Sequence, residues 1–181
     1  RPWARILAAL PPMSGQTVLD LGCGVGDLAL EFVARGAHVV GIDGNHELLA
    51  AARGHGLRHA EFHHGDLRAP LALARPVDGI WCSFAAAYLP ELVPVLRSWA
   101  HALRSGGWIA VTEIDDLFGH EPVAQRTRDA FASYAQQSFA AGRYDFHMGR
   151  RLRAHLEQAG FAVALELACD DQELAFAGPA L

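Results

Sequence analysis

Three glycines at every second position follow a short apolar run near the start of the chain. The stretch VLDLGCGVG at 18–26 contains Gly22, Gly24 and Gly26. Because glycine has no Cβ, such a turn lets the backbone come close to a bulky ligand. The next position, where the dinucleotide pattern GxGxxG has its last glycine, is Asp27. A carboxylate at the start of the following helix would repel a pyrophosphate, so the spacing favours a nucleoside ligand without phosphate.

Two carboxylates follow at the ends of the next two expected strands. Asp43 ends VVGID, about 20 residues beyond the glycines, where a carboxylate can accept hydrogen bonds from both hydroxyls of a ribose. Asp66 ends HHGD and is expected at the neighbouring strand end, where it can accept a bond from an adenine amino group. The two acids therefore predict contacts to the two halves of an adenosine.

The elements that position these residues alternate along the chain. Apolar runs of strand length alternate with segments of helical period, which predicts a parallel sheet covered by helices. The expected strands are 17–21, 37–43, 58–64, 77–84 and 107–114. The expected helices are 27–35, 45–53, 89–103, 123–141 and the stretch MGRRLRAHLEQAGF at 148–161. SGG at 105–107 is interpreted as the end of the helix over 89–103.

Residues 1–181 are expected to form a single domain. The segment 117–147 exceeds the minimal strand–helix repeat and is predicted to be a helical lid inserted after the fifth strand. Residues 161–167 and 172–177 are expected to form a closing pair of strands.

Composition argues against several classes of protein. The chain has no lysine, which excludes Schiff-base chemistry and the phosphate-binding lysine of a P-loop. Its formal net charge is −5 and its one basic run is RRLR at 150–153, which argues against nucleic-acid binding. No apolar run is long enough to cross a bilayer, so no membrane partner is expected. Three widely spaced cysteines indicate reduced thiols in a cytoplasmic protein.

Four segments in order resemble the motifs of the class I S-adenosylmethionine-dependent methyltransferases. They are VLDLGCGVG, VVGID, the GD at 65–66 and LRSGGWIAVTE. The resemblance covers roughly residues 14–115, and GRRLRAHLEQAGF is similar to the last helix of the family. It implies a Rossmann-like, doubly wound α/β fold with a mostly parallel sheet, helices on both faces and antiparallel strands at the C-terminal edge. It also implies methyl transfer with S-adenosylmethionine as the cofactor.

The resemblance assigns the cofactor to residues at or just after the ends of the first four expected strands. These residues are Asp20, Gly22, Gly24, Asp43, Gly44, Asp66, Leu67 and Ser83. In the family pattern the glycine backbone contacts the methionine half, with Asp20 supporting the loop. Asp43 holds the ribose and Asp66 addresses the adenine. The residues from Ser83 onward pass under the sulfonium.

Methyl transfer from a sulfonium needs few catalytic residues, because the protein mostly positions the reactants. An oxygen acceptor gains from a base, and His120 in DDLFGHEP is the first candidate. Tyr88 is the second candidate catalytic residue, and Tyr144 and His147 are expected to line the pocket. For each of them a plain surface role is the alternative. The histidines between positions 55 and 64 are expected to be solvated, with no bound metal.

The segment after the fourth expected strand limits the class of methyl acceptor. Branches of the family that methylate nucleobases or glutamine amides have NPPY or DPPY there, whereas this chain has SFAAAY at 83–88. The expected acceptor is therefore an oxygen or nitrogen atom of a small molecule. Two alternatives stay open: a nicotinamide-dependent oxidoreductase on the same sheet, which Asp27 disfavours, and a non-catalytic module that binds S-adenosylmethionine.

Overall fold

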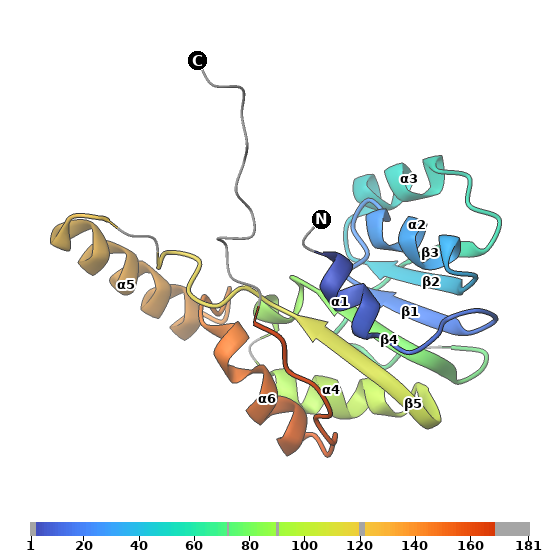
Figure 1. Cartoon of the computed structure of the whole chain (residues 1–181). Helices are drawn as coiled ribbons and strands as arrows, with labels where there is room; N and C mark the ends of the chain where they lie inside the picture. The colour runs from blue at the N-terminus through green and yellow to red at the C-terminus, as the bar shows by residue number, and fades with distance from the viewer. Residues whose placement is uncertain (1–2, 72, 90, 120–121, 169–181) are drawn as a thin grey trace.

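A single sheet of parallel strands organises the molecule (Figure 1). The computed structural model describes residues 3–71, 73–89, 91–119 and 122–168. The strands are β1 (Thr17–Leu21), β2 (His38–Asp43), β3 (Ala60–His64), β4 (Val77–Ser83) and β5 (Leu103–Thr112). They lie in the order β3-β2-β1-β4-β5, and every neighbouring pair is parallel. The predicted mostly parallel sheet is confirmed.

Helices cover both faces of this sheet, as the resemblance implied. The covering helices are α1 (Trp3–Ala9), α2 (Asp27–Ala34), α3 (His46–Gly54), α4 (Leu92–Ala100) and α6 (Met148–Gln158). The described ranges also contain α5 (Gln125–Ala140) and a short 3-10 helix η1 (Ala86–Tyr88) after β4. None of the helices in the described ranges has the length and apolar composition needed to cross a membrane.

Alternation along the strands sends side chains to two separate cores. On one face, Val18 of β1 and Trp81 of β4 pack with apolar residues of α1, α2 and α3; the rings of Phe32 and Trp81 meet edge-on at 5.6 Å. On the other face, Leu19 and Ile80 pack against α4, with α6 beside it. Because β1 and β4 are buried on both sides, they read as near-continuous apolar runs.

The junction between α4 and β5 differs from the prediction. The helix ends at Ala100 rather than 103, and β5 begins at Leu103, so SGG at 105–107 does not end the helix. Leu103 pairs with Val77 while Trp108 already pairs with Gly79, which leaves the intervening residues of β5 outside the regular ladder. The Trp108 ring lies directly over Gly79, where a Cβ would meet it at 2.2 Å. Only glycine at position 79 leaves room for the ring in this register.

The C-terminal region also departs from the prediction. Residues 161–168 form no strand, so the strand expected at 161–167 is wrong, and the one expected at 172–177 lies outside the described residues. Phe161 instead packs against the core beside α4 and α6. Within the described ranges, the sheet therefore has no antiparallel strand beside β5.

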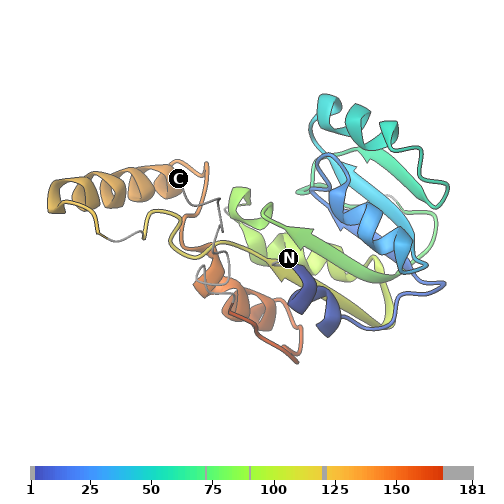
Figure 2. The same ribbon diagram turned by 45° about the horizontal axis from the view of Figure 1, so that its top comes forward.

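Helix α5 extends away from the rest of the molecule. Figures 1 and 2 show it projecting beyond the carboxyl end of β5, from two directions of view. It belongs to the segment 117–147, whose role as a lid stays a prediction. Aromatic rings connect it to the domain: Phe118 stacks on Phe131 of α5 at 4.5 Å and on Phe146 at 4.6 Å.

Candidate functional site

The loop after β1 is held in a conformation that needs glycine. Gly22, Gly24 and Gly26 have φ values of +74°, +53° and +83°, in the left-handed region that residues with a Cβ rarely adopt. The backbone N–H groups of Gly22 and Cys23 both donate to the carbonyl of Ile42, at 2.8 and 3.2 Å. The glycine loop is thus tied to the end of β2.

Two of these glycines have different surroundings. A Cβ added to Gly22 would lie 2.5 Å from the Cβ of Ala85, so this glycine permits close packing against the turn after β4. A Cβ added to Gly24 would meet no atom within 4 Å. The backbone at Gly24 is therefore open on one side, as a loop must be if a ligand is to lie against it.

Asp43 connects the glycine loop to the start of α3. Its half-buried carboxylate accepts the N–H of Gly24 at 2.9 Å with one oxygen and the N–H of Asn45 at 2.8 Å with the other. A carboxylate offers about four lone-pair sites, so each oxygen keeps an acceptor site. The carboxylate thus adjoins the open glycine, and its spare acceptor sites fit the diol of a ribose.

Asp20 is buried beneath the same loop. It is 3% exposed, and its Oδ2 has no hydrogen-bond partner in the described part of the chain. Burial, together with the nearby charge of Asp43, raises the pKa of Asp20 to about 7. A buried acceptor without a donor fits a ligand that brings hydrogen-bond donors.

Asp66 and Leu67, the two residues expected on the adenine side, differ in their surroundings. The exposed carboxylate of Asp66 pairs with Arg68 at 2.9 Å, and this hydrogen bond lowers the pKa of Asp66. Leu67 is half-buried, and its Cδ1 lies 3.8 Å from the position of a Cβ on Gly22. Its carbonyl accepts the indole N–H of Trp99 at 3.0 Å. The structure thus brings Leu67 to the glycine loop, while Asp66 lies at the surface.

Gly44 directly follows β2, and Ser83 ends β4, on the other side of β1. The carbonyl of Gly44 is 3.1 Å from Nε2 of His64, at the end of β3. The hydroxyl of Ser83 accepts a hydrogen bond from the Thr112 hydroxyl at 2.8 Å, across the β4–β5 pair. Both lie at the carboxyl edge of the sheet, where open α/β sheets bind their ligands.

Of the two candidate catalytic residues, the structure describes Tyr88 and not His120. Tyr88 is 60% exposed, and its ring meets that of Tyr144 edge-on at 4.7 Å. Burial raises the pKa of Tyr144 to about 12. His120, the first candidate base, lies outside the described residues. His147, expected in the pocket, is half-buried at the start of α6.

Glu113 is a functional candidate that the motif analysis left without a role. It directly follows β5, and its Oε1 accepts the N–H of Ala87 at 2.9 Å. Its Oε2 is buried and has no partner in the described part of the chain, and burial raises the pKa of Glu113. The available signal was its position, a single acid ending the apolar run WIAVT.

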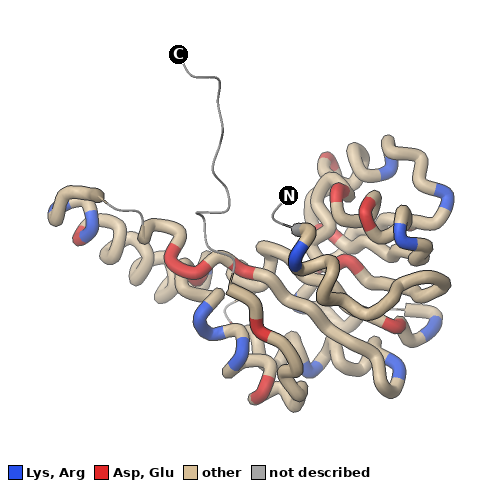
Figure 3. Tube along the Cα trace, in the orientation of Figure 1, with Lys and Arg blue, Asp and Glu red and all other residues tan. Residues whose placement is uncertain are grey.

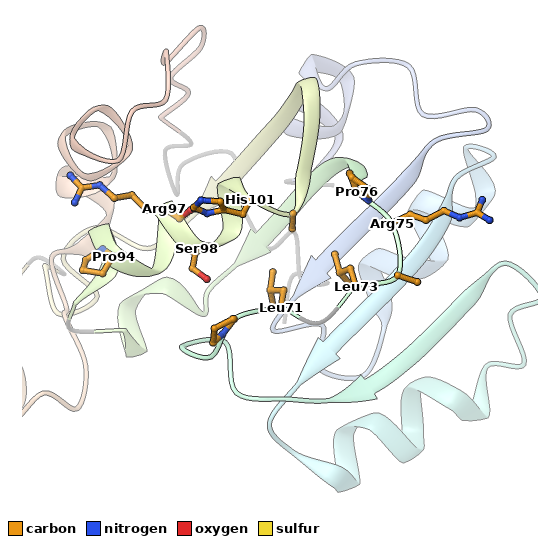
Figure 4. Close-up of a pocket in the computed structure, with 11 residues that line it drawn as sticks. Leu71, Leu73, Arg75, Pro76, Pro94, Arg97, Ser98 and His101 are labelled. Carbon is orange, nitrogen blue, oxygen red and sulfur yellow. The ribbon is translucent and has the colours of Figure 1, made fainter.

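A groove on the described surface lies away from these residues. The groove, of about 570 Å³, separates the connection before β4 from α4, and Leu71, Leu73 and Pro76 line one side (Figure 4). The side chains of Arg75 and Arg97 extend away from it in opposite directions. This groove lies toward the amino-terminal end of β4, so it does not belong to the loops at the carboxyl edge. The described residues also contain no group of three or more potential metal ligands.

Comparisons with known proteins agree with this geometry. Residues 18–107 match the family described as Methyltransferase domain. A trans-aconitate 2-methyltransferase of Azoarcus sp. is 39% identical over 108 residues, which is 59% of this chain and 42% of the relative. A ubiquinone biosynthesis O-methyltransferase of Xylella fastidiosa is 35% identical over 58% of this chain and 44% of the relative. A 23S rRNA (uracil(1939)-C(5))-methyltransferase of Hahella chejuensis is 39% identical over 45% of this chain and 19% of the relative.

The chain spans less than half of the length of these curated relatives. Among solved structures, an S-adenosylmethionine-dependent methyltransferase from Mesorhizobium loti has the same fold, with a TM-score of 0.68 and 24% identity over 88% of this chain and 80% of that one. The complex of DhpI with SAH has a TM-score of 0.57 and 25% identity over 64% of this chain and 56% of that one. With an open glycine loop beside Asp43 at the carboxyl edge of such a sheet, the chain belongs to the class I S-adenosylmethionine-dependent methyltransferases.

Proposed function

We propose that this chain transfers a methyl group from S-adenosylmethionine to an oxygen or nitrogen atom of a small molecule. The observation that carries the proposal is the open backbone of Gly24, hydrogen-bonded to a half-buried Asp43 that keeps spare acceptor sites. When bound, the cofactor supplies an activated methyl group on a sulfonium.

The work left to the chain is positioning. Backbone groups of the glycine loop would hold the methionine half, and Asp43 would hold the ribose through its spare acceptor sites. Leu67 would pack beside the loop, and the turn beginning at Ser83 would border the methyl group. Tyr88 and His120 stay candidates for contact with the acceptor.

Charge supports a small acceptor rather than a nucleic acid. Acidic and basic residues are mixed along the chain, with no continuous basic stripe in the described part (Figure 3). The formal net charge is −5. Nucleic-acid binding needs clustered positive charge to neutralise phosphates. Two of the relatives are named for small-molecule substrates, although a third is named for 23S rRNA.

The first experiment measures binding by titration calorimetry with S-adenosylmethionine, S-adenosylhomocysteine and NADH. We expect binding of the first two and none of NADH; tight NADH binding would favour the oxidoreductase alternative.

The second experiment follows transfer of a labelled methyl group to a mixture of phenols, carboxylic acids and amines, with a 23S rRNA fragment in a separate reaction. Labelling of the small molecules supports the proposal, and labelling of the RNA alone contradicts it. Cofactor binding without any transfer would favour the non-catalytic module.

A further inference from the structure

The turn after β4 is held by hydrogen bonds to both backbone groups of one residue, Ala87. The N–H of Ala87 donates to Oε1 of Glu113 at 2.9 Å, and the carbonyl of Ala87 accepts the N–H of Asp145 at 2.8 Å. Ala87 itself is only 2% exposed. Glu113 follows β5 and Asp145 lies between α5 and α6. Two segments distant in sequence therefore fix the same turn.

Glu113 is an uncommon choice for a purely structural anchor. Its carboxylate is largely buried, and no arginine of the described ranges pairs with it. The charged or titratable groups that face it are Asp145 and Tyr144 from the segment before α6 and the thiol of Cys82 from β4. Asp145 already has its own partner, Arg151, at 2.7 Å. A neutral acceptor would hold Ala87 without the cost of burying a charge that lacks a cation.

The held turn also touches the glycine loop. Ala85, two residues before Ala87, packs against Gly22 so closely that a Cβ on that glycine would lie 2.5 Å from its own. At the other end of the turn, Tyr88 is largely exposed and meets the ring of Tyr144. The turn thus lies between the loop that holds the cofactor and the exposed side chains available to an acceptor.

We propose that Glu113 is a positioning residue for methyl transfer, which fixes the turn at 83–88 through the N–H of Ala87 and so sets the distance between the cofactor and the acceptor. This inference rests on the proposed function. Because the cofactor is held mainly by the glycine loop and Asp43, loss of the Glu113 carboxylate acts on turnover more than on cofactor affinity. An ionised carboxylate makes a stronger hydrogen bond than a neutral acceptor, so its charge as well as its shape contributes.

The test compares Glu113→Gln, Glu113→Ala and the control Glu61→Gln, an exposed acid on β3. Glu113→Gln keeps one acceptor oxygen of the same reach, replaces the other oxygen by an NH2 group and removes the charge, so it stays informative if Glu113→Ala fails to fold. Three quantities are measured: the Kd for S-adenosylmethionine, hydrogen exchange of the Ala87 amide, and turnover with the mixture of phenols, acids and amines. The pH titration of the Ala87 amide shift in the wild type identifies the carboxylate it contacts.

We expect Glu113→Gln to lower turnover and Ala87 protection by about tenfold, the size of the change from a charge-assisted to a neutral hydrogen bond, with a less than about twofold change in Kd. The wild-type Ala87 shift should titrate with a midpoint above the ordinary value for Glu, and this titration should vanish in the variant. Unchanged turnover, unchanged Ala87 protection, or a Kd that weakens in parallel with turnover would each overturn the inference. Failure of the proposed function would look different, because the wild type and the Glu61 control would then also lack cofactor binding or transfer.

Discussion

Asp20 offers a direct test of the electrostatics under the glycine loop. Its pKa is raised from 3.8 to about 7, first by burial and then by Asp43. Between these two values the folded protein keeps the proton that the unfolded chain releases, so the free energy of unfolding falls as pH rises through this window. Each pKa unit corresponds to ~1.4 kcal/mol, so a pKa raised by about three lowers the free energy of unfolding by at most about 4 kcal/mol across this window.

The substitution Asp20→Asn replaces the protonated acid by a neutral group of the same shape. Urea unfolding measures the free energy of unfolding of the wild type and of the variant. At about pH 4 the two values should differ only by an offset that does not depend on pH. Toward about pH 8 the variant should become more stable relative to the wild type, by up to about 4 kcal/mol. The exposed acid Asp129 supplies the control Asp129→Asn, for which no such growth is expected. A difference between wild type and Asp20→Asn that stays constant over this range, or that shrinks as pH rises, would refute the reasoning.

Three substitutions test the rest of the cofactor site. Gly22→Ala brings a Cβ within 2.5 Å of Ala85 at a φ of +74°, so we expect a loss of about 2–4 kcal/mol in stability by thermal or urea unfolding. Gly24→Ala meets no atom within 4 Å, so its folding cost should be only the ~1–2 kcal/mol of left-handed strain, while calorimetry shows a large loss of cofactor affinity. Asp43→Ala removes the acceptor of two backbone N–H groups and should weaken cofactor binding by ~1.5–3 kcal/mol, with a measurable loss of stability as well. Unchanged affinity in either of the last two variants would contradict the assignment of that residue.

Much of the fold could be predicted because its signals are local. The central strands β1 and β4 are buried on both faces, so they appear as apolar runs that end within a residue or so of the predicted positions. The helix predicted over 45–53 starts at Asn45, a residue type that favours helix N-termini, and the Asn45 side chain accepts the N–H groups of Glu47 and Leu48. The glycine spacing likewise corresponds to three left-handed backbone positions.

The errors arise where tertiary contacts override local signals. SGG at 105–107 has the composition of a helix end, yet Val77 pairs with Leu103 just before it, so the strand begins first. Residues 161–167 are apolar enough for a strand, but Phe161 packs against the core beside α4, and residues 162–168 form no strand in the described part of the chain. In both cases the deciding contact joins residues far apart in the chain.

The same distinction separates what could be predicted about the site from what could not. Residue types at strand ends indicated which groups can hold an adenosine, because each motif is contiguous. The chemical state of those groups depends on pairs that the motifs do not join. Asp43 bonds to Gly24 across 19 positions and Glu113 to Ala87 across 26. The pKa of Asp20 is raised by its burial and by the carboxylate of Asp43 at the end of the next strand. The motifs therefore identify the cofactor, whereas the carboxylates that tune and position the site become visible only once the sheet brings its strand ends together.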